Sequence, residues 1–211
     1  MQKRFTEFIA NLARTRSTDS SFNMYSGDSA ANTVRRNNLL LYFQQMEERK
    51  PEVLLVGEAP GYQGTRQTGV GFCSEYIILN GIPEIGLFGK QRGYRKTDEF
   101  KDKVWKEPSA TIVWGTLAKV KKLPLIWASF PFHPHQPGNA LSNRTPTKLE
   151  VKTGQPTLQE IIKIFKIKTV VAVGGIADWT LTDLGIVHTR VRHPSHGGKN
   201  EFTKGIAQLL C

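Results

Sequence analysis

The stretch "VLLVGEAPGYQG", residues 53–64, decides the fold prediction because it joins a buried strand to a glycine-rich bend. Its apolar start is typical of a strand covered on both faces, as in a parallel sheet. The strand stops at Gly-Glu-Ala-Pro-Gly, where glycines let a ligand approach backbone N–H groups closely. Two phosphate-binding patterns do not fit. The bend lacks the Lys of a P-loop, and Pro60 spoils the dinucleotide fingerprint.

Strands and helices alternate along the rest of the chain, which predicts an α/β fold. We expect a small central parallel four-stranded sheet flanked by helices. We also expect a single domain over residues 1–211, with residues 1–50 as a helical extension packed on the core. The prolines of 131–147 argue against any regular structure there. Besides 53–57, strands are predicted at 123–130, 169–175 and 186–193, and helices at 5–13, 34–48, 108–120, 156–167, 176–184 and 199–210.

The composition is globular but basic, with 29 Lys and Arg against 18 Asp and Glu, a net charge of +11. Such a surplus favours a polyanion partner such as DNA, RNA or acidic lipid, although a soluble protein can also simply be basic. The two cysteines, Cys73 and Cys211, cannot form a disulfide framework or a four-cysteine metal site. We see neither a secretory signal nor a membrane span, so we expect a cytoplasmic, nucleoid-associated protein without a membrane partner.

Ligands of parallel sheets bind beyond the carboxyl ends of the strands. After the predicted strand 186–193 comes "HPSHGG", whose Ser and Gly residues expose donors of the kind that bind phosphate. A structural role for His193 is the plainer alternative. His133 and His135 could bind a metal, but a third ligand of suitable spacing is not evident, so no metal is predicted.

The segment 90–106 carries seven Lys and Arg among Tyr94, Phe100 and Trp105. Basic residues with interleaved aromatic rings are typical of a nucleic-acid surface. A solvated segment held by salt bridges fits the pattern equally well.

Taken in order, four motifs resemble those of the uracil-DNA glycosylase superfamily. They are G-E-A-P-G (57–61), T-G-V-G-F (68–72), P-G-N (137–139) and H-P-S (193–195). The similarity spans residues 51–210 and is greatest to the branch called family four. It implies a monofunctional, monomeric hydrolase without a cofactor. That enzyme would release uracil, or a related deaminated base, flipped out of DNA and leave an abasic site for base-excision repair.

The resemblance also assigns roles to individual residues. His193 would stabilise the departing base, and Glu58 is the candidate for orienting the water or the motif backbone. Phe72 matches the aromatic residue that stacks on the flipped base. The remaining assignments are Gly57, Ala59, Pro60, Gly61 and Ala128 for substrate binding, and Arg192, Ser195, His196, Gly197, Gly198 and Lys199 for DNA binding.

Three departures from the family pattern matter. Ala128 stands where an Asn usually reads the uracil edge. Either the register of this match is shifted, or the Asn has been lost, naturally or by engineering. If the Asn has been lost, we expect reduced excision of uracil. Ala59 replaces the water-activating Asp, and Gly61 the bulky residue that blocks thymine. The four cysteines of the iron–sulfur members are missing, so a cluster is excluded.

Two other functions stay open from the sequence. The same fold could serve as a non-catalytic binder of flipped or damaged bases in DNA. A hydrolase of free nucleotides or nucleosides is the other alternative, which the basic surplus disfavours.

Overall fold

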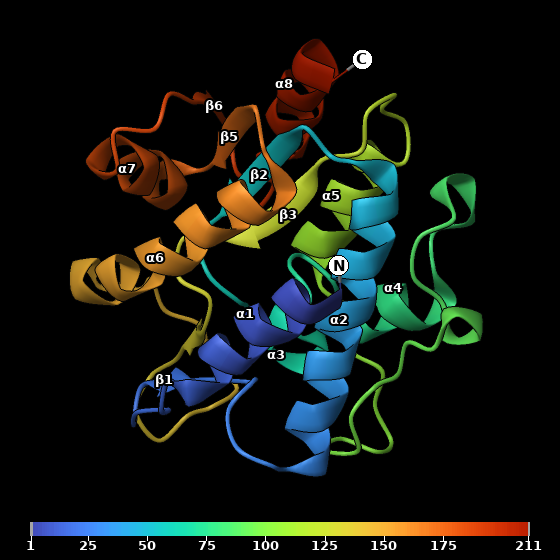
Figure 1. Cartoon of the computed structure of the whole chain (residues 1–211), viewed down its shortest axis with the longest axis vertical. Helices are drawn as coiled ribbons and strands as arrows, with labels where there is room; N and C mark the ends of the chain where they lie inside the picture. Colours follow the sequence, from blue (N-terminus) through green and yellow to red (C-terminus); the bar gives the residue numbers. More distant parts are fainter. Residues whose placement is uncertain (1, 211) are drawn as a thin grey trace. The chain divides into compact units, whose positions relative to one another are not determined.

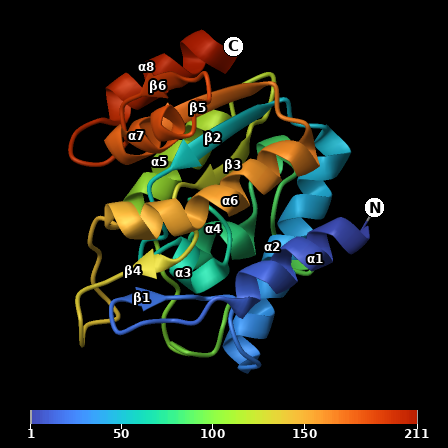
Figure 2. The same ribbon diagram turned by 60° about the vertical axis from the view of Figure 1, so that its left-hand side comes forward.

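A computed structural model describes residues 2–210 (Figures 1 and 2). Its contacts divide the chain into two compact units. The helical unit comprises Met1–Glu48, Pro60–Glu107 and Phe132–Arg144, and the sheet unit comprises Arg49–Ala59, Pro108–Pro131 and Thr145–Cys211. The single domain expected over residues 1–211 stays a prediction, and Cys211 lies outside the described residues.

The sheet unit contains the predicted four-stranded parallel sheet, so the predicted α/β fold is confirmed. The strand order is β3-β2-β5-β6. Every residue of β2 is buried, as its apolar run predicts. The strands are β2 (Val53–Gly57), β3 (Leu125–Ala128), β5 (Thr169–Val173) and β6 (Thr189–Val191).

Four helices cover this sheet. In both ribbon views α6 and α7 lie on one face, and α5 and α8 lie together on the other (Figures 1 and 2). Both faces of the sheet are therefore closed to solvent, which explains its continuous apolar strands. The helices are α5 (Pro108–Leu117), α6 (Lys148–Phe165), α7 (Gly175–Asp183) and α8 (Lys199–Leu210).

The start of α6 corrects the sequence prediction of a helix at 156–167. The helix begins eight positions earlier, after a capping box at Thr147. The Thr147 hydroxyl accepts the Glu150 N–H at 3.2 Å, and the Glu150 carboxylate accepts the Thr147 N–H at 2.7 Å. Pro156 therefore lies inside the helix, on its exposed side, where water can solvate the carbonyl left without a helical partner. The Thr-x-x-Glu pattern was the missed signal.

The helical unit is built on α1 (Gln2–Arg14) and α2 (Ala30–Arg49). Phe5, Phe8, Ile9 and Leu12 of α1 are at most 5% exposed, which confirms the predicted amphipathic face. The rings of Phe5 and Phe8 pack against Phe43 of α2, with centroids 5.5 and 5.7 Å away. The shorter elements of the unit are α3 (Thr65–Thr68), α4 (Glu75–Asn80), η1 (Pro83–Ile85) and η2 (Lys90–Arg92).

A short strand pair corrects the expectation that 131–147 has no regular structure. β1 (Ser21–Phe22) pairs antiparallel with β4 (His133–Pro134). Pro134 has no N–H to donate. In a two-stranded pair, however, the outer edge of each strand needs no hydrogen-bond donor, so a proline is tolerated there. The next residue, His135, continues the contact by donating its N–H to the Ser20 carbonyl at 2.9 Å.

No helix within residues 2–210 has both the length and the apolar character needed to cross a bilayer.

Gly154 brings α6 against the chain that leaves β3. A Cβ at this position would lie 2.4 Å from the Ser129 carbonyl oxygen and 2.9 Å from Pro131 Cδ. The glycine is therefore a steric requirement of this packing.

We expect Gly154→Ala to lower the free energy of unfolding by about 2 kcal/mol, because the new methyl group overpacks a backbone contact. The matched control is Gly115→Ala in α5, where nothing lies within 4 Å of the added Cβ. That change should raise stability by about 0.5–1 kcal/mol through helix propensity. Urea unfolding measures both, and equal stabilisation by the two substitutions would contradict the close approach.

Candidate functional site

In the sheet unit, the carboxyl ends of β2 and β3 coincide. Gly57 pairs with Ala128, and the chain beyond β3 stays attached to the bend. The N–H and the hydroxyl of Ser129 both donate to the Gly57 carbonyl at 2.9 Å. Phe130 donates its N–H to the Glu58 carbonyl at 3.1 Å. The start of the Gly-Glu-Ala-Pro-Gly bend is therefore held in one conformation by the segment after β3.

Glu58 is half-buried at this edge of the sheet. Burial raises the pKa of its carboxyl, and a hydrogen bond from the Thr145 hydroxyl acts in the opposite direction. Thr145 lies two residues before Thr147, the N-cap of α6, so the segment that leads into this helix contacts the bend. The carboxyl is thus held in place and protonates more readily than a surface glutamate.

Ala128 is the last residue of β3, at the end of the strand as predicted, and it is half-buried. It offers no side-chain hydrogen bond. Its neighbour Ser129 is fully buried, and its hydroxyl donates to Gly57. Ser129 is therefore engaged in holding the bend. Ala59, where the resemblance to the superfamily would place an Asp, likewise carries no polar side chain.

His193 follows β6 and is fixed by Ser195. Its Nδ1 accepts the Ser195 N–H at 3.1 Å and lies 2.6 Å from the Ser195 hydroxyl oxygen. Since an N–H donor faces Nδ1, that nitrogen is unprotonated and the neutral ring carries its proton on Nε2. Burial lowers the pKa of His193 to about 4, and the charges of His196 and Arg192 act in the same direction. At neutral pH the residue is therefore a neutral Nε2–H donor.

The loop after His193 is tightly folded. His196 and Gly197 adopt left-handed backbone angles, with φ of 50° and 78°. A Cβ at Gly198 would lie 2.1 Å from the His193 carbonyl oxygen, so only glycine fits there. The Ser195 groups expected to contact phosphate instead contact His193, and the phosphate role stays a prediction. Arg192, His196, Gly197 and Lys199 are exposed, and Arg192 forms an ion pair with Glu201 at 3.6 Å.

In the helical unit, Phe72 occupies a strained position. Its φ is 47°, a value that non-glycine residues rarely adopt. The Thr68 hydroxyl closes the turn, accepting the Val70 N–H at 3.2 Å and donating to the Cys73 carbonyl at 2.7 Å. The half-buried Phe72 is thereby held in a fixed turn, as a stacking residue would require, although its role stays a prediction.

Pro60 and Gly61 begin the second stretch of the helical unit, and Glu107 ends it. A Cβ at Gly61 would lie 2.6 Å from Glu107 Oε1, and one at Gly64 would lie 2.2 Å from Oε2. Burial raises the pKa of Glu107 to about 7. No sequence pattern around Glu107 indicates a contact with a turn more than 40 positions earlier, so the residue is not among the predicted site residues.

Asn143 contacts the same turn. Its Oδ1 accepts the Tyr62 N–H at 2.9 Å, and both amide atoms lie 3.8 Å from the Cβ position of Gly61. Gly61 is therefore flanked by a carboxyl group and an amide group.

His133 and His135 stack on each other with ring centroids 5.5 Å apart. Each contacts a backbone carbonyl: His133 Nε2 lies 2.9 Å from the Ser142 oxygen, and His135 Nδ1 lies 3.0 Å from the Gln136 oxygen. Within residues 2–210, no group of three or more His, Cys, Asp or Glu side chains could hold a metal ion. The contacts of the two histidines are therefore those of structural residues in a proline-rich loop.

Two of the three aromatic rings in the basic segment 90–106 are buried, and Phe100 is half-buried. Tyr94 and Trp105 are 1% and 4% exposed, so neither ring can stack on a base. Lys96 donates to three backbone carbonyls of the same segment at 2.9–3.0 Å, and Lys103 lies 3.3 Å from the centroid of the Trp105 ring. At least part of the positive charge therefore stabilises the loop itself.

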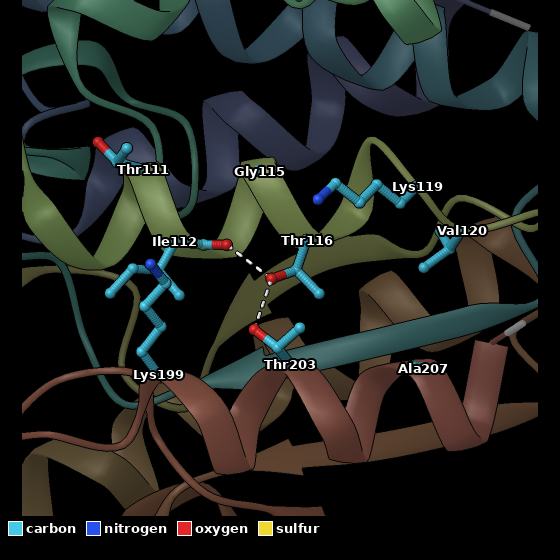
Figure 3. A pocket seen from close by; sticks show the side chains of 9 residues that line it. All are labelled: Thr111, Ile112, Gly115, Thr116, Lys119, Val120, Lys199, Thr203 and Ala207. Carbon is cyan, nitrogen blue, oxygen red and sulfur yellow. Dashed lines mark hydrogen bonds between the residues drawn. The ribbon is translucent and has the colours of Figure 1, made fainter.

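A separate pocket of about 340 Å³ lies between α5 and α8 (Figure 3). The hydroxyl oxygens of Thr116 and Thr203 lie 3.1 Å apart, and Thr116 also bonds the Ile112 carbonyl. Lys199 is the one predicted site residue in its wall. The lining is formed by Thr111, Ile112, Gly115, Thr116, Lys119, Val120, Lys199, Thr203 and Ala207.

The family model described as "Uracil DNA glycosylase superfamily" matches residues 43–208. Among solved structures, the chain is similar to wild-type SMUG2 from Pedobacter heparinus, with a TM-score of 0.67 and 15% sequence identity. That match covers 99% of this chain and 95% of the other, and it shows a shared fold. No curated protein sequence matches the chain.

The raised pKa of Glu107 predicts a pH-dependent stability. The folded state holds the proton more tightly than the unfolded chain, so the stabilisation is complete below about pH 4.5 and is lost as the pH rises through 7. At pH 8 the free energy of unfolding of Glu107→Gln should therefore exceed that of the wild type by about 3 kcal/mol, and at pH 4 the two should be equal. The exposed Glu84→Gln is the control in urea titrations. Parallel pH profiles for all three proteins would contradict the shift.

The hydrogen bonds of His193 predict its tautomer. In ¹⁵N–¹H spectra of the imidazole rings, His193 should be neutral with its proton on Nε2 at pH 7, and it should titrate with a midpoint near 4. A midpoint above 6, or a proton on Nδ1, would show that Ser195 does not hold the ring as described.

Proposed function

Because the chain belongs to the uracil DNA glycosylase superfamily, we propose that it hydrolyses the N-glycosidic bond of uracil, or of a related deaminated base, in DNA. The product is an abasic site, the substrate of later steps of base-excision repair. The observation that carries the proposal is His193: a neutral imidazole with its proton on Nε2, held by Ser195 beyond β6.

His193 would act on the leaving base. Cleavage of the bond between the sugar C1′ and the base N1 leaves the electron pair on uracil, and the negative charge is felt chiefly at O2. A preorganised Nε2–H donor stabilises that charge without first having to lose or gain a proton. The amides of the bend Gly57–Gly61 would supply further donors, and Pro60 would help to set its shape.

Water then completes the reaction at the oxocarbenium-like sugar. Glu58 is our candidate for orienting this water, or the motif backbone, because its carboxyl is half-buried and held by Thr145. Ala59 has no side chain that could perform this task in place of the family's Asp. No metal or organic cofactor enters the scheme.

The base must leave the helical stack before it can react, at a cost of about a few kcal/mol. Stacking on an aromatic ring contributes about 1–3 kcal/mol per base, so Phe72 would offset much of that cost. The fixed turn around Phe72 would preorganise the ring for this contact.

DNA binding is proposed for the loop 195–198 with Arg192 and Lys199. Arg192, His196 and Lys199 are exposed, and the chain carries a net charge of +11. Lys199 begins α8, so phosphate would also meet the N-terminus of a 12-residue helix. We propose that the protein acts as a monomer on DNA in the cytoplasm.

A non-catalytic binder of flipped bases is the second candidate. The observation that favours it is Ala128, which offers no hydrogen-bonding side chain at the end of β3 while the Ser129 hydroxyl is engaged with Gly57. A binder would retain affinity for uracil-containing DNA without forming abasic sites.

Alkali treatment of a uracil-containing oligonucleotide after incubation with the protein decides between the two. We expect strand cleavage at the uracil, and a rate about 100- to 1000-fold lower for His193→Ala, since one oxyanion donor is lost. His188→Ala is the matched control, a half-buried histidine before the start of β6 that contacts Asp178.

Tight binding without cleavage by the wild type would instead support the binder. Equal rates for His193→Ala and the wild type would remove His193 from the mechanism.

A further inference from the structure

Gly174 lies between β5 and α7, against the histidine that the proposed reaction uses. A Cβ at this position would lie 3.2 Å from His193 Cβ and 3.8 Å from both Cγ and Cδ2 of the ring. The first distance is shorter than an ordinary contact between carbon atoms, so any larger residue would push against the side chain of His193. Both residues belong to the sheet unit.

The backbone of Gly174 ties the end of β6 to the start of α7. Its φ of 91° and ψ of 179° lie in a region that is essentially restricted to glycine. Its N–H donates to the Val191 carbonyl at 3.0 Å, directly after the last β5–β6 pair, Val173 with Val191. The chain can therefore turn into α7 while the end of β6, two residues before His193, stays attached.

The start of α7 also favours a neutral ring at His193. Gly174 is the N-cap residue of this helix, and no side chain caps it. Burial lowers the pKa of His193 to about 4, and the charges of His196 and Arg192 act in the same direction. The partial positive charge of a helix N-terminus likewise disfavours a cation beside it. The close approach to Gly174 thus places the imidazole where it stays uncharged.

We propose that Gly174 is a positioning residue for His193: its missing side chain seats the imidazole beside the start of α7 and so fixes the Nε2–H that the leaving base requires. The inference rests on the proposed function for the task of His193, and Gly174 acts through that ring rather than on the substrate. Ser195 holds the ring on its Nδ1 side, and Gly174 limits it on its Cδ2 side.

The decisive variant is Gly174→Ala, whose methyl group would move the side chain of His193 by a few tenths of an ångström. A misplacement of about 1 Å costs about 100-fold in rate, so we expect kcat for uracil release to fall about 10-fold, with KM changed less than about threefold. Gly175→Ala is the matched control and should leave both constants unchanged. Its Cβ would meet only Arg190 Nη2, at an ordinary 3.7 Å, and its φ is not positive.

A His193→Ala background separates displacement of the ring from backbone strain. It keeps the strain at position 174 and the contact with the Cβ of residue 193, but it has no imidazole to displace. Gly174→Ala should therefore slow single-turnover uracil release about 10-fold in the wild type and less than about twofold in this background. An equal loss in both would make the role of Gly174 purely structural and overturn the inference.

A second readout needs no catalysis. In ¹⁵N–¹H spectra, His193 should titrate with a midpoint near 4 in the wild type and in Gly175→Ala. Gly174→Ala should raise this midpoint above about 5, since a ring displaced from its seat regains hydration of its charged form. An unchanged midpoint would overturn the inference while leaving the proposed function standing.

The wild type alone provides a test that does not depend on the folding of any variant. Nuclear Overhauser contacts should join the Hα protons of Gly174 to Hβ or Hδ2 of His193, and their absence would overturn the inference. If the wild type releases no uracil, the proposed function fails, and the titrations and these contacts then decide whether Gly174 positions the ring.

Discussion

The carbonyl of Gly57 accepts two hydrogen bonds from Ser129, and the geometry of the first motif depends on them. They continue the β2–β3 pairing one residue past the end of the sheet, so the bend begins from a fixed point. Gly154 allows α6 to press on the same segment. The Glu58 carboxyl accepts a hydrogen bond from the Thr145 hydroxyl, two residues before the N-cap of that helix. Hydrogen bonds from the backbone and from two side-chain hydroxyls, together with the close approach of α6, thus set this edge of the sheet.

Burial shifts the pKa values of the half-buried acids and of His193 in opposite directions. It raises the pKa of Glu58 and Glu107 and lowers that of His193, because in each case the charged form loses solvation. His193 is therefore a neutral donor at physiological pH, while Glu107 can exchange a proton near neutrality.

Much of the architecture could be predicted from local patterns. The strand 53–57 and the helix 199–210 have the predicted bounds, because apolar periodicity and capping act over a few residues. The predicted start of α6 at Pro156 follows the preference of proline for a first helical turn, whereas the capping box of Thr147 and Glu150 marks the true start. The strand pair of β1 and β4 could not be foreseen, because its partners are more than 100 residues apart.

The candidate site divides in the same way. The order of short motifs along the amino-acid sequence was enough to indicate the superfamily and to single out His193, since a motif needs only its own residues. The folded chain was needed to show that Ser195 sets the tautomer of His193, and that Glu107 and Asn143 flank Gly61. Tyr62 and Asn143 are 81 positions apart. Hydrogen-bond partners and desolvation of this kind arise only when distant segments meet, and no local pattern encodes them.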